Sequence, residues 1–237
     1  MLVAARYWPA DTTSEIGGDF YDLFEIDDGR WGVTIGDVCG KGIEAAALTG
    51  VTRHTIRAAA RHLASPADVL QWTYEAIMGY DSETYATVCF AFLKLLDGEA
   101  ELDIALAGHP GPMLYRADGT SEALGTQGTV LGLVEPNVTR TRHAVAAGDT
   151  VVFYTDGITD APGGQAVSLG ELEDAARRAS DTGPGATADA IRACVERRRP
   201  DGSSDDTAIL VLQFAGVAGE DTSRAGGARV THDAGAR

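Results

Sequence analysis

The sequence predicts an α+β domain in which strand hairpins are followed by pairs of helices. Runs of apolar residues typical of strands come in blocks, near residues 2–38, 86–116 and 150–155. Stretches with helical character occupy residues 48–77 and 168–198. A parallel α/β fold would alternate single strands with single helices, so these blocks favour layered antiparallel sheets and helix pairs.

The first block predicts three strands, at residues 2–7, 20–26 and 31–38. The last two are joined by DDGR at 27–30, and an Asp-Gly pair favours a tight hairpin turn. The apolar period then becomes helical, and one face of this helix holds Leu48, Val51, Thr55, Ile56, Ala59 and Leu63.

A second helix is expected to begin at Pro66, because Ser65 suits the N-cap and Pro the first helical position. SLGE at 168–171 has the spacing of a capping box and opens a helix that runs to residue 179. The helix that begins at Pro66 should bury Val69, Leu70, Thr73 and Ile77. The remaining predicted elements are strands at 86–96, 100–107, 112–116, 150–155 and 208–214 and a helix at 188–198.

No repeat or linker divides residues 1–215, which we interpret as one domain. Residues 216–237 consist mainly of Gly, Ala, Thr, Asp and Arg with almost no large apolar side chain. Such a composition is typical of a disordered tail, and the sequence predicts one there.

Composition narrows the class of partner. Lys and Arg number 19 against 35 Asp and Glu, a net charge of -16, which argues against nucleic acid and anionic membranes as partners. An acidic chain suits carboxylate pockets for hard cations. Three widely spaced cysteines predict neither disulfides nor a zinc site, and no apolar run has the length of a membrane span. We therefore expect a cytoplasmic protein.

Acidic residues stand where extended runs begin or end. Asp19 precedes one strand, Asp37 ends another, Asp156 follows a third, and Asp205 and Asp206 precede the last. A lone Asp-Gly is usually a turn. Asp156 differs because loop rather than strand follows it, and Asp37 differs because it lies between a buried strand and a helix.

Several carboxylates gathered at one place repel one another and need cations to stay ionised together. Oxygen ligands select magnesium or manganese over zinc or copper. Two such ions about 3.5–4 Å apart share a carboxylate and make a bridging hydroxide at neutral pH. Spacing along the chain does not by itself show that the acids meet.

Seven motifs occur in one order along the chain: GGDFYD (17–22), IGDVCGKG (35–42), AGHP (107–110), LG (131–132), GD (148–149), YTDGITDA (154–161) and DDT (205–207). Together they resemble the PPM-type metal-dependent protein phosphatases, the protein phosphatase 2C-like superfamily, in its bacterial SpoIIE/RsbU-like branch. The resemblance spans roughly residues 4–214 and implies an α-β-β-α sandwich of two stacked sheets flanked by helix pairs. It also implies two manganese or magnesium ions.

By this resemblance Asp37 bridges both metals, and the Val38 carbonyl is an additional ligand. Asp19 serves the second metal directly or through water. Asp156 and Asp205 are the remaining ligands of the first metal. The neighbouring Asp206 is the alternative to Asp205 in this role. Eukaryotic members of the family hold the substrate phosphate with an arginine. Arg6 is a candidate for this role here, and the alternative is that Arg6 is only a solvated charge on a strand.

One further motif and two single residues suggest other kinds of site. GKGIEA at 40–45 matches the dinucleotide fingerprint G-x-G-x-x-A, but two helices follow where a second strand is needed. Cys39 lacks the arginine six residues on that a cysteine phosphatase requires, and a small buried side chain is expected instead. His109 is either a general acid or, as we favour, a residue that shapes a Gly/Pro turn.

The leading hypothesis is therefore a metal-dependent serine/threonine phosphatase. The resemblance implies a phosphoprotein substrate such as an anti-sigma-factor antagonist. The alternative hypothesis is a pseudophosphatase or binding module that senses a partner without turnover. The helix pair at 42–79 is either a static core layer, as we favour, or a surface for a partner or a homodimer that regulates metal occupancy.

Overall fold

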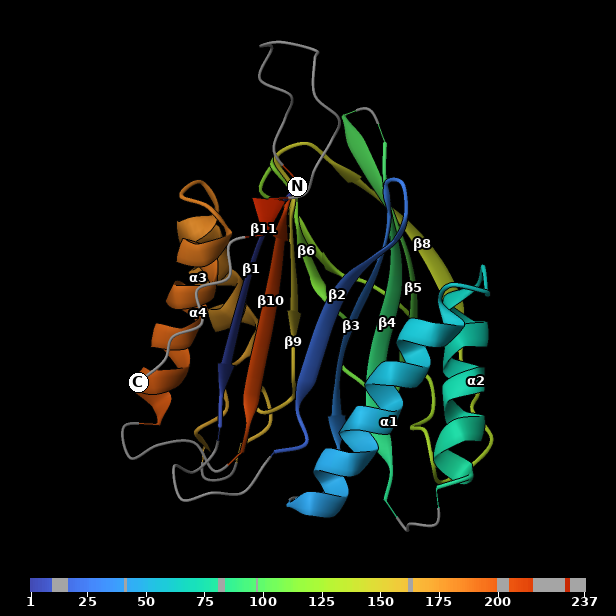
Figure 1. Ribbon diagram of the computed structural model, residues 1–237. Coiled ribbons are helices and arrows are strands. Elements are labelled where there is room, and N and C mark those ends of the chain that lie inside the picture. Colours follow the sequence, from blue (N-terminus) through green and yellow to red (C-terminus); the bar gives the residue numbers. More distant parts are fainter. Residues whose placement is uncertain are drawn as a thin grey trace.

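Four layers make up the domain in the computed structural model: two helices, two stacked β-sheets and two further helices (Figure 1). The structure describes residues 1–9, 17–40, 42–80, 84–96, 98–161, 164–199, 205–214 and 229–230. The layered α+β architecture predicted from the sequence is confirmed.

One sheet, here the β3 sheet, is antiparallel throughout, with the strand order β2-β3-β4-β5-β8 in the described chain. The hairpin predicted at residues 27–30 joins β2 to β3, and Gly29 takes the positive φ of 74° that its turn requires. The strands are β2 (Phe20–Asp27), β3 (Arg30–Val38), β4 (Ala86–Leu95), β5 (Glu99–Ala107) and β8 (Arg140–Ala146).

The other sheet, here the β1 sheet, has the order β11-β1-β10-β9-β6-β7. The β1–β10 pair in this sheet joins strands from the two ends of the domain, with Leu2 opposite Gln213 and Trp8 opposite Thr207. The strands are β1 (Leu2–Trp8), β6 (Met113–Tyr115), β7 (Ser121–Ala123), β9 (Thr150–Tyr154), β10 (Thr207–Gln213) and β11 (Arg229–Val230).

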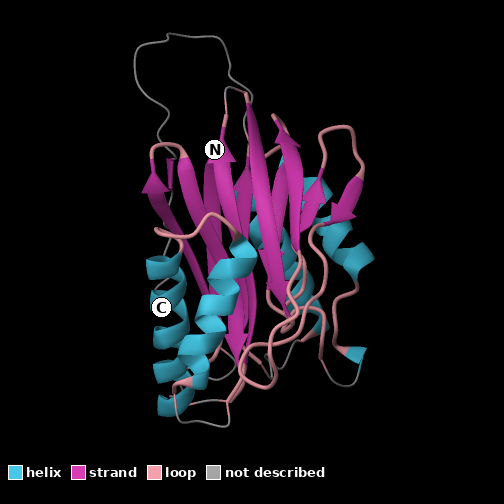
Figure 2. Cartoon of the chain, turned by 90° about the vertical axis from the view of Figure 1, so that its right-hand side faces the viewer, coloured by secondary structure: helices cyan, strands magenta, loops and turns pink. Residues whose placement is uncertain are grey.

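Each sheet is covered on its outer face by a helix pair, as Figures 1 and 2 show. Helices α1 (Ile43–Ala59) and α2 (Pro66–Met78) lie against the β3 sheet. Helices α3 (Leu169–Ser180) and α4 (Pro184–Arg198) lie against the β1 sheet. The connection from β3 into α1 therefore carries the chain from the end of a strand directly onto the outer layer.

Three apolar layers hold these elements together. Between the sheets lie side chains such as Ile35, Leu102 and Phe153, all fully buried. A second layer joins the β3 sheet to α1 and α2, and a third joins the β1 sheet to α3 and α4. Burying apolar surface on both faces of each sheet is the main force that orders such a sandwich.

Several boundaries differ from the sequence prediction. Helix α1 ends at Ala59, before Leu63, and buries Thr52 where Val51 was expected. Helix α4 begins at Pro184 rather than at residue 188, because Pro suits the first turn. Strands β7 and β8 were not predicted, since their residues are mostly exposed and carry little apolar alternation.

Most of the tail predicted to be disordered, residues 216–237, lies outside the described residues. Within the tail, Arg229 and Val230 form β11, which pairs with β1 in parallel, so this short piece has a strand that the sequence did not predict. Disorder in the rest stays a prediction.

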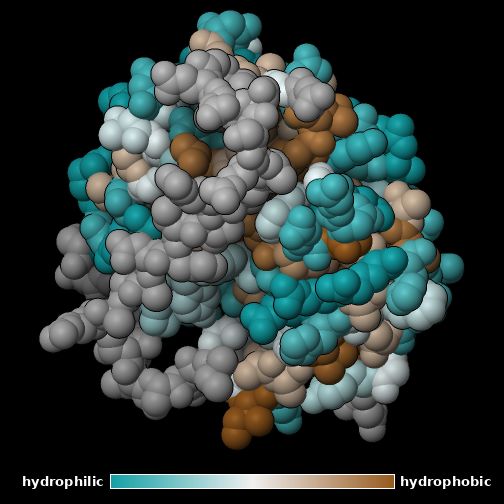
Figure 3. Space-filling view, turned by 45° about the horizontal axis from the view of Figure 1, so that its top comes forward, coloured by the Kyte–Doolittle hydropathy of each residue, from teal (hydrophilic) through white to brown (hydrophobic). Residues whose placement is uncertain are grey.

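Within the described residues, Cys39, Cys89 and Cys194 are all free thiols, as expected. Cys39 is exposed, however, so the expectation of a buried side chain there is wrong. No helix in the described part of the chain is long and apolar enough to cross a membrane. Figure 3 shows hydrophilic side chains interspersed with separate hydrophobic ones on the upper face.

The two helix N-caps formed by serine provide a matched stability test. The Ser168 hydroxyl accepts a hydrogen bond from the Glu171 amide in a complete capping box, whereas Ser65 makes no side-chain cap bond. We expect Ser168→Ala to lower the free energy of unfolding by about 1 kcal/mol. Ser65→Ala should cost clearly less. Urea denaturation of both variants measures the difference, and equal losses would contradict this assignment.

Candidate metal centre

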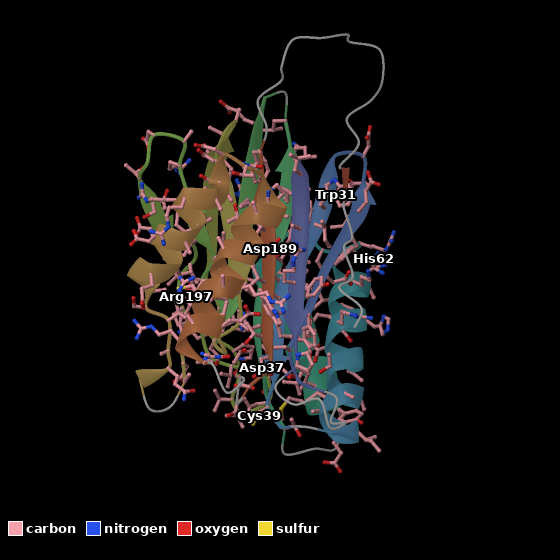
Figure 4. The ribbon with its side chains drawn as sticks, turned by 90° about the vertical axis from the view of Figure 1, so that its left-hand side faces the viewer. Trp31, Asp37, Cys39, His62, Asp189 and Arg197 are labelled. Carbon is pink, nitrogen blue, oxygen red and sulfur yellow. The ribbon has the colours of Figure 1, made fainter. Side chains whose placement is uncertain are left out.

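The acidic motifs meet at one end of the sandwich. Asp37 lies near the end of β3, and Figure 4 shows it with Cys39 at the lower end of the domain, opposite Trp31. Asp19 immediately precedes β2, Asp156 follows β9, and Asp205 lies two residues before β10. Because the β2–β3 and β9–β10 pairs are antiparallel, each brings the end of one strand beside the start of the next.

Asp19 is held between the two sheets. It is 8% exposed, and the Thr155 hydroxyl donates a hydrogen bond to its Oδ2 at 2.7 Å. The same hydroxyl oxygen accepts from the Ala208 amide at 2.9 Å. Thr155 thus anchors a carboxylate at the start of the β3 sheet to two strands of the β1 sheet.

Two glycines make room for this arrangement. A Cβ built on Gly18 would collide with the Val38 carbonyl oxygen and would lie 2.5 Å from Asp37 Oδ1. A Cβ on Gly17 would collide with the Asp206 carboxylate. The Val38 amide also donates to the Gly18 carbonyl at 3.2 Å. Only a residue without a side chain lets the backbone approach these oxygens so closely.

The neighbours Asp205 and Asp206 have different surroundings. Asp206 is 7% exposed, and the Tyr7 hydroxyl donates to its Oδ2 at 3.2 Å. Asp205 is exposed, and its Oδ1 accepts from the Asp206 amide at 2.9 Å. Which of the two binds metal stays a prediction, in favour of Asp205.

Electrostatics shows that the carboxylates lie close together. Burial raises the pKa of Asp19 to about 8, opposed by the Thr155 hydrogen bond and reinforced by the charge of Asp37. Burial, followed by the charges of Asp156 and Asp205, raises the pKa of Asp37 to about 7. Burial, followed by the charge of Asp205, raises the pKa of Asp156. Partial burial raises the pKa of Asp205, reinforced by the charge of Asp206 and opposed by the hydrogen bond from the Asp206 amide.

Three neighbours of these acids had no role predicted from the sequence. Asp160 is close enough to raise the pKa values of both Asp156 and Asp205. Thr155 and Tyr7 orient carboxylates, as described above. Thr155 and Asp160 lie inside the YTDGITDA motif, so the motif contained the signal, but nothing in the sequence marked Tyr7.

The residues fit divalent cations. All the donors are oxygens, which suit magnesium or manganese. Their charges oppose one another in a buried region, so bound cations would relieve the repulsion that raises these pKa values. Among the described residues no three acidic, His or Cys side chains already form a closed ligand set. The ligand roles of Asp19, Asp37, Val38, Asp156 and Asp205 therefore belong to the proposal below.

Two other candidates have structural roles. His109 is fully buried, its Nδ1 lies 2.9 Å from the Thr87 hydroxyl, and burial lowers its pKa to about 3. A neutral imidazole closed off from solvent does not suit a general acid. Arg6 forms an ion pair with Asp189 of α4 at 2.8 Å, which favours neither the phosphate role nor a purely solvated charge.

The fold is the one found in phosphatase domains of the PP2C type. A family model described as Stage II sporulation protein E (SpoIIE) matches residues 27–215, so the chain belongs to the SpoIIE family.

Individual relatives agree with this assignment. Phosphoserine phosphatase RsbP of Bacillus subtilis is 27% identical over 63% of this chain and 38% of its own. The RsbU and RsbW domains of Rv1364c from Mycobacterium tuberculosis superpose with a TM-score of 0.75 and 27% identity, over 90% of this chain and 60% of that one. RsbX in complex with magnesium gives a TM-score of 0.68 at 13% identity, over 88% and 92% of the two chains. This chain spans 29–44% of the length of three curated relatives that it matches: Protein IcfG of Synechocystis, and RsbP and RsbU of Bacillus subtilis.

The raised pKa values predict how metal-free protein responds to pH. Asp19 and Asp37 bind protons in the folded state up to about pH 8 and 7, but only near pH 4 when unfolded. Folded protein therefore holds more protons between these limits, and stability in chelator should fall as pH rises from 5 to 8. Thermal unfolding in EDTA across this range measures the slope.

Asp19→Asn should flatten this pH dependence and raise stability at pH 8 by on the order of 1 kcal/mol or more, since one pKa unit corresponds to about 1.4 kcal/mol. Asp28→Asn, at an exposed turn, is the control and should leave the slope unchanged. An unaltered slope in Asp19→Asn would contradict the assignment of this group.

Gly18 should tolerate no side chain. Gly18→Ala places a Cβ against the Val38 carbonyl and Asp37, and we expect it to weaken manganese binding by at least tenfold. Gly50→Ala is the matched control, because a Cβ at this position in α1 has open space around it. That substitution should instead stabilise the helix by about 0.5–1 kcal/mol. Titration calorimetry measures the affinity for manganese, which should fall in Gly18→Ala and stay unchanged in Gly50→Ala.

Proposed function

We propose that this chain is a metal-dependent serine/threonine protein phosphatase. The observation that carries the proposal is the convergence of Asp19, Asp37, Asp156 and Asp205 at the end where the two sheets meet. Membership of the SpoIIE family and similarity to proteins named phosphoserine phosphatases support the reaction type.

In this proposal two magnesium or manganese ions occupy the acidic end. Asp37 would be shared by both ions and the Val38 carbonyl would add a ligand. Asp156 and Asp205 would complete the set that holds the first ion, and Asp19 would hold the second directly or through water. Similarity to RsbX, whose structure is a complex with magnesium, supports the choice of ion. Bound ions would polarise the phosphate and lower the pKa of a nucleophilic water.

The protein supplies position rather than a covalent intermediate. Thr155 fixes Asp19, and Tyr7 fixes Asp206, so neither carboxylate is free to turn away when the site is loaded. Gly17 and Gly18 keep side chains out of the space between these oxygens. Cys39 is exposed beside the site but has no part in the proposed reaction.

We propose a phosphoprotein as the substrate, with a small regulatory protein such as an anti-sigma-factor antagonist as the class to test first. Likeness to proteins named RsbP and RsbU supports this class. The charge of -16 argues against a nucleic-acid substrate, because a polyanion would be repelled.

Conversion of single carboxylates to amides tests the proposal. Asp37→Asn and Asp156→Asn each remove a ligand charge with little change in volume, and we expect each to lower kcat by at least a hundredfold. Release of phosphate from a phosphoserine protein, with manganese and with added chelator, is the measurement. Asp174→Asn, at an exposed position on α3, is the control and should keep full activity.

Cys39→Ser should also remain active, because the proposed nucleophile is not a thiol. Near-full activity in Asp37→Asn would exclude the two-metal mechanism. Manganese binding without phosphate release from any phosphoprotein would favour the alternative, a binding module without turnover.

A further inference from the structure

An open pocket lies directly beside the acidic end, between the start of the β3 sheet and α1. Its volume is about 460 Å³. Asp19 and Gly17 connect it to the candidate metal centre, and the Thr49 hydroxyl ties α1 to this edge by a hydrogen bond to the Gly18 carbonyl at 3.3 Å. The described lining is Tyr7, Gly17, Asp19, Phe20, Tyr21, Ala46, Thr49 and Arg53.

Helix α1 presents one face to this pocket. Ala46, Thr49 and Arg53 are spaced by three and four residues, so they lie along the same side of the helix. Ala46 is small and keeps the pocket open, while Arg53 is exposed. The adjoining face of α1, with Leu48 and Ile56, is buried in the core.

The arginines of α1 differ in what they contact. Arg57, one turn further on, pairs with Asp22 at 3.1 Å and lies 4.9 Å over the ring of Phe24. No hydrogen bond or ion pair joins Arg53 to another residue that the structure describes. Arg57 is therefore engaged in the fold, whereas the guanidinium of Arg53 is available to a ligand.

Arg53 and Asp19 are the two charged side chains among the lining residues, and Asp19 belongs to the metal centre. A phosphorylated segment that approaches this end of a strongly acidic protein meets repulsion unless a cation faces it. Guanidinium forms paired, charge-assisted hydrogen bonds with phosphate or carboxylate oxygens. The pocket has the charge and the position to hold the substrate beside the reacting group.

We propose that this pocket binds the phosphorylated segment of the substrate and that Arg53 is its anion-binding residue. The inference rests on the proposed phosphatase function and adds a binding subsite to it. The anion is either the phosphate itself or an acidic side chain next to the phosphoserine, and both present the oxygen pair that a guanidinium recognises.

Steady-state kinetics of the full chain with manganese tests this inference. The substrates are p-nitrophenyl phosphate, a phosphoserine peptide with neutral neighbours, and the same peptide with glutamates beside the phosphoserine. We expect Arg53→Ala to raise KM roughly tenfold, the loss typical of one charge-assisted contact, with kcat within twofold of wild type. Arg53→Lys should recover part of the loss, and Arg57→Ala should leave KM unchanged.

The pattern across substrates identifies the anion. A rise in KM for all three shows that Arg53 binds the phosphate, and a rise only for the acidic peptide shows that it binds a neighbouring carboxylate. Unchanged KM for every substrate overturns the inference, as does an equal rise in Arg57→Ala.

Failure of the proposed function gives a different result, because wild type would then hydrolyse none of the substrates. In that case fluorescence anisotropy with the labelled acidic phosphopeptide decides the inference. Binding that weakens in Arg53→Ala but not in Arg57→Ala supports the subsite, and binding that is absent or unaltered overturns it. Thermal unfolding confirms that each variant is folded.

Discussion

Mutual repulsion of buried carboxylates is the constraint on which the lower end of this domain depends. Several acids stand where two sheets meet, and burial makes their charges costly. The fold tolerates them because Thr155 fixes Asp19 across the sheets and Tyr7 fixes Asp206. The three apolar layers supply the stability that keeps these charges together, and cations would remove the cost.

Local patterns predicted most of the fold. Asp28-Gly29 marked the first hairpin, the SLGE motif marked α3, and all four residues predicted to be buried in α2 are buried. Strand β8 was not predicted, because Val145 is its one fully buried residue and its sequence shows no apolar alternation. Pairing with β5, rather than an apolar pattern of its own, places β8 at the edge of the sheet.

The site was harder to predict than the fold. Its carboxylates stood out only as acids at strand ends, and ordered motifs, not spacing, suggested that they meet. Contacts that depend on tertiary structure could not be foreseen, such as the Tyr7 hydroxyl on Asp206, which joins residues 199 positions apart. The exposed thiol of Cys39 and the pairing of Arg6 with Asp189 show the same limit, since each depends on which layer covers the residue.

The pairing of β1 with β10 bears on how the chain acquires its structure. Leu2 on β1 pairs with Gln213 on β10, so this pair of strands forms only after nearly all of the domain has left the ribosome. Contacts of such long sequence separation slow folding, because a large loop must close first. The hairpins of the β3 sheet are local by comparison. Nascent chains should therefore hold Asp37 in a formed strand well before Asp205 arrives, and cation affinity should emerge late in synthesis.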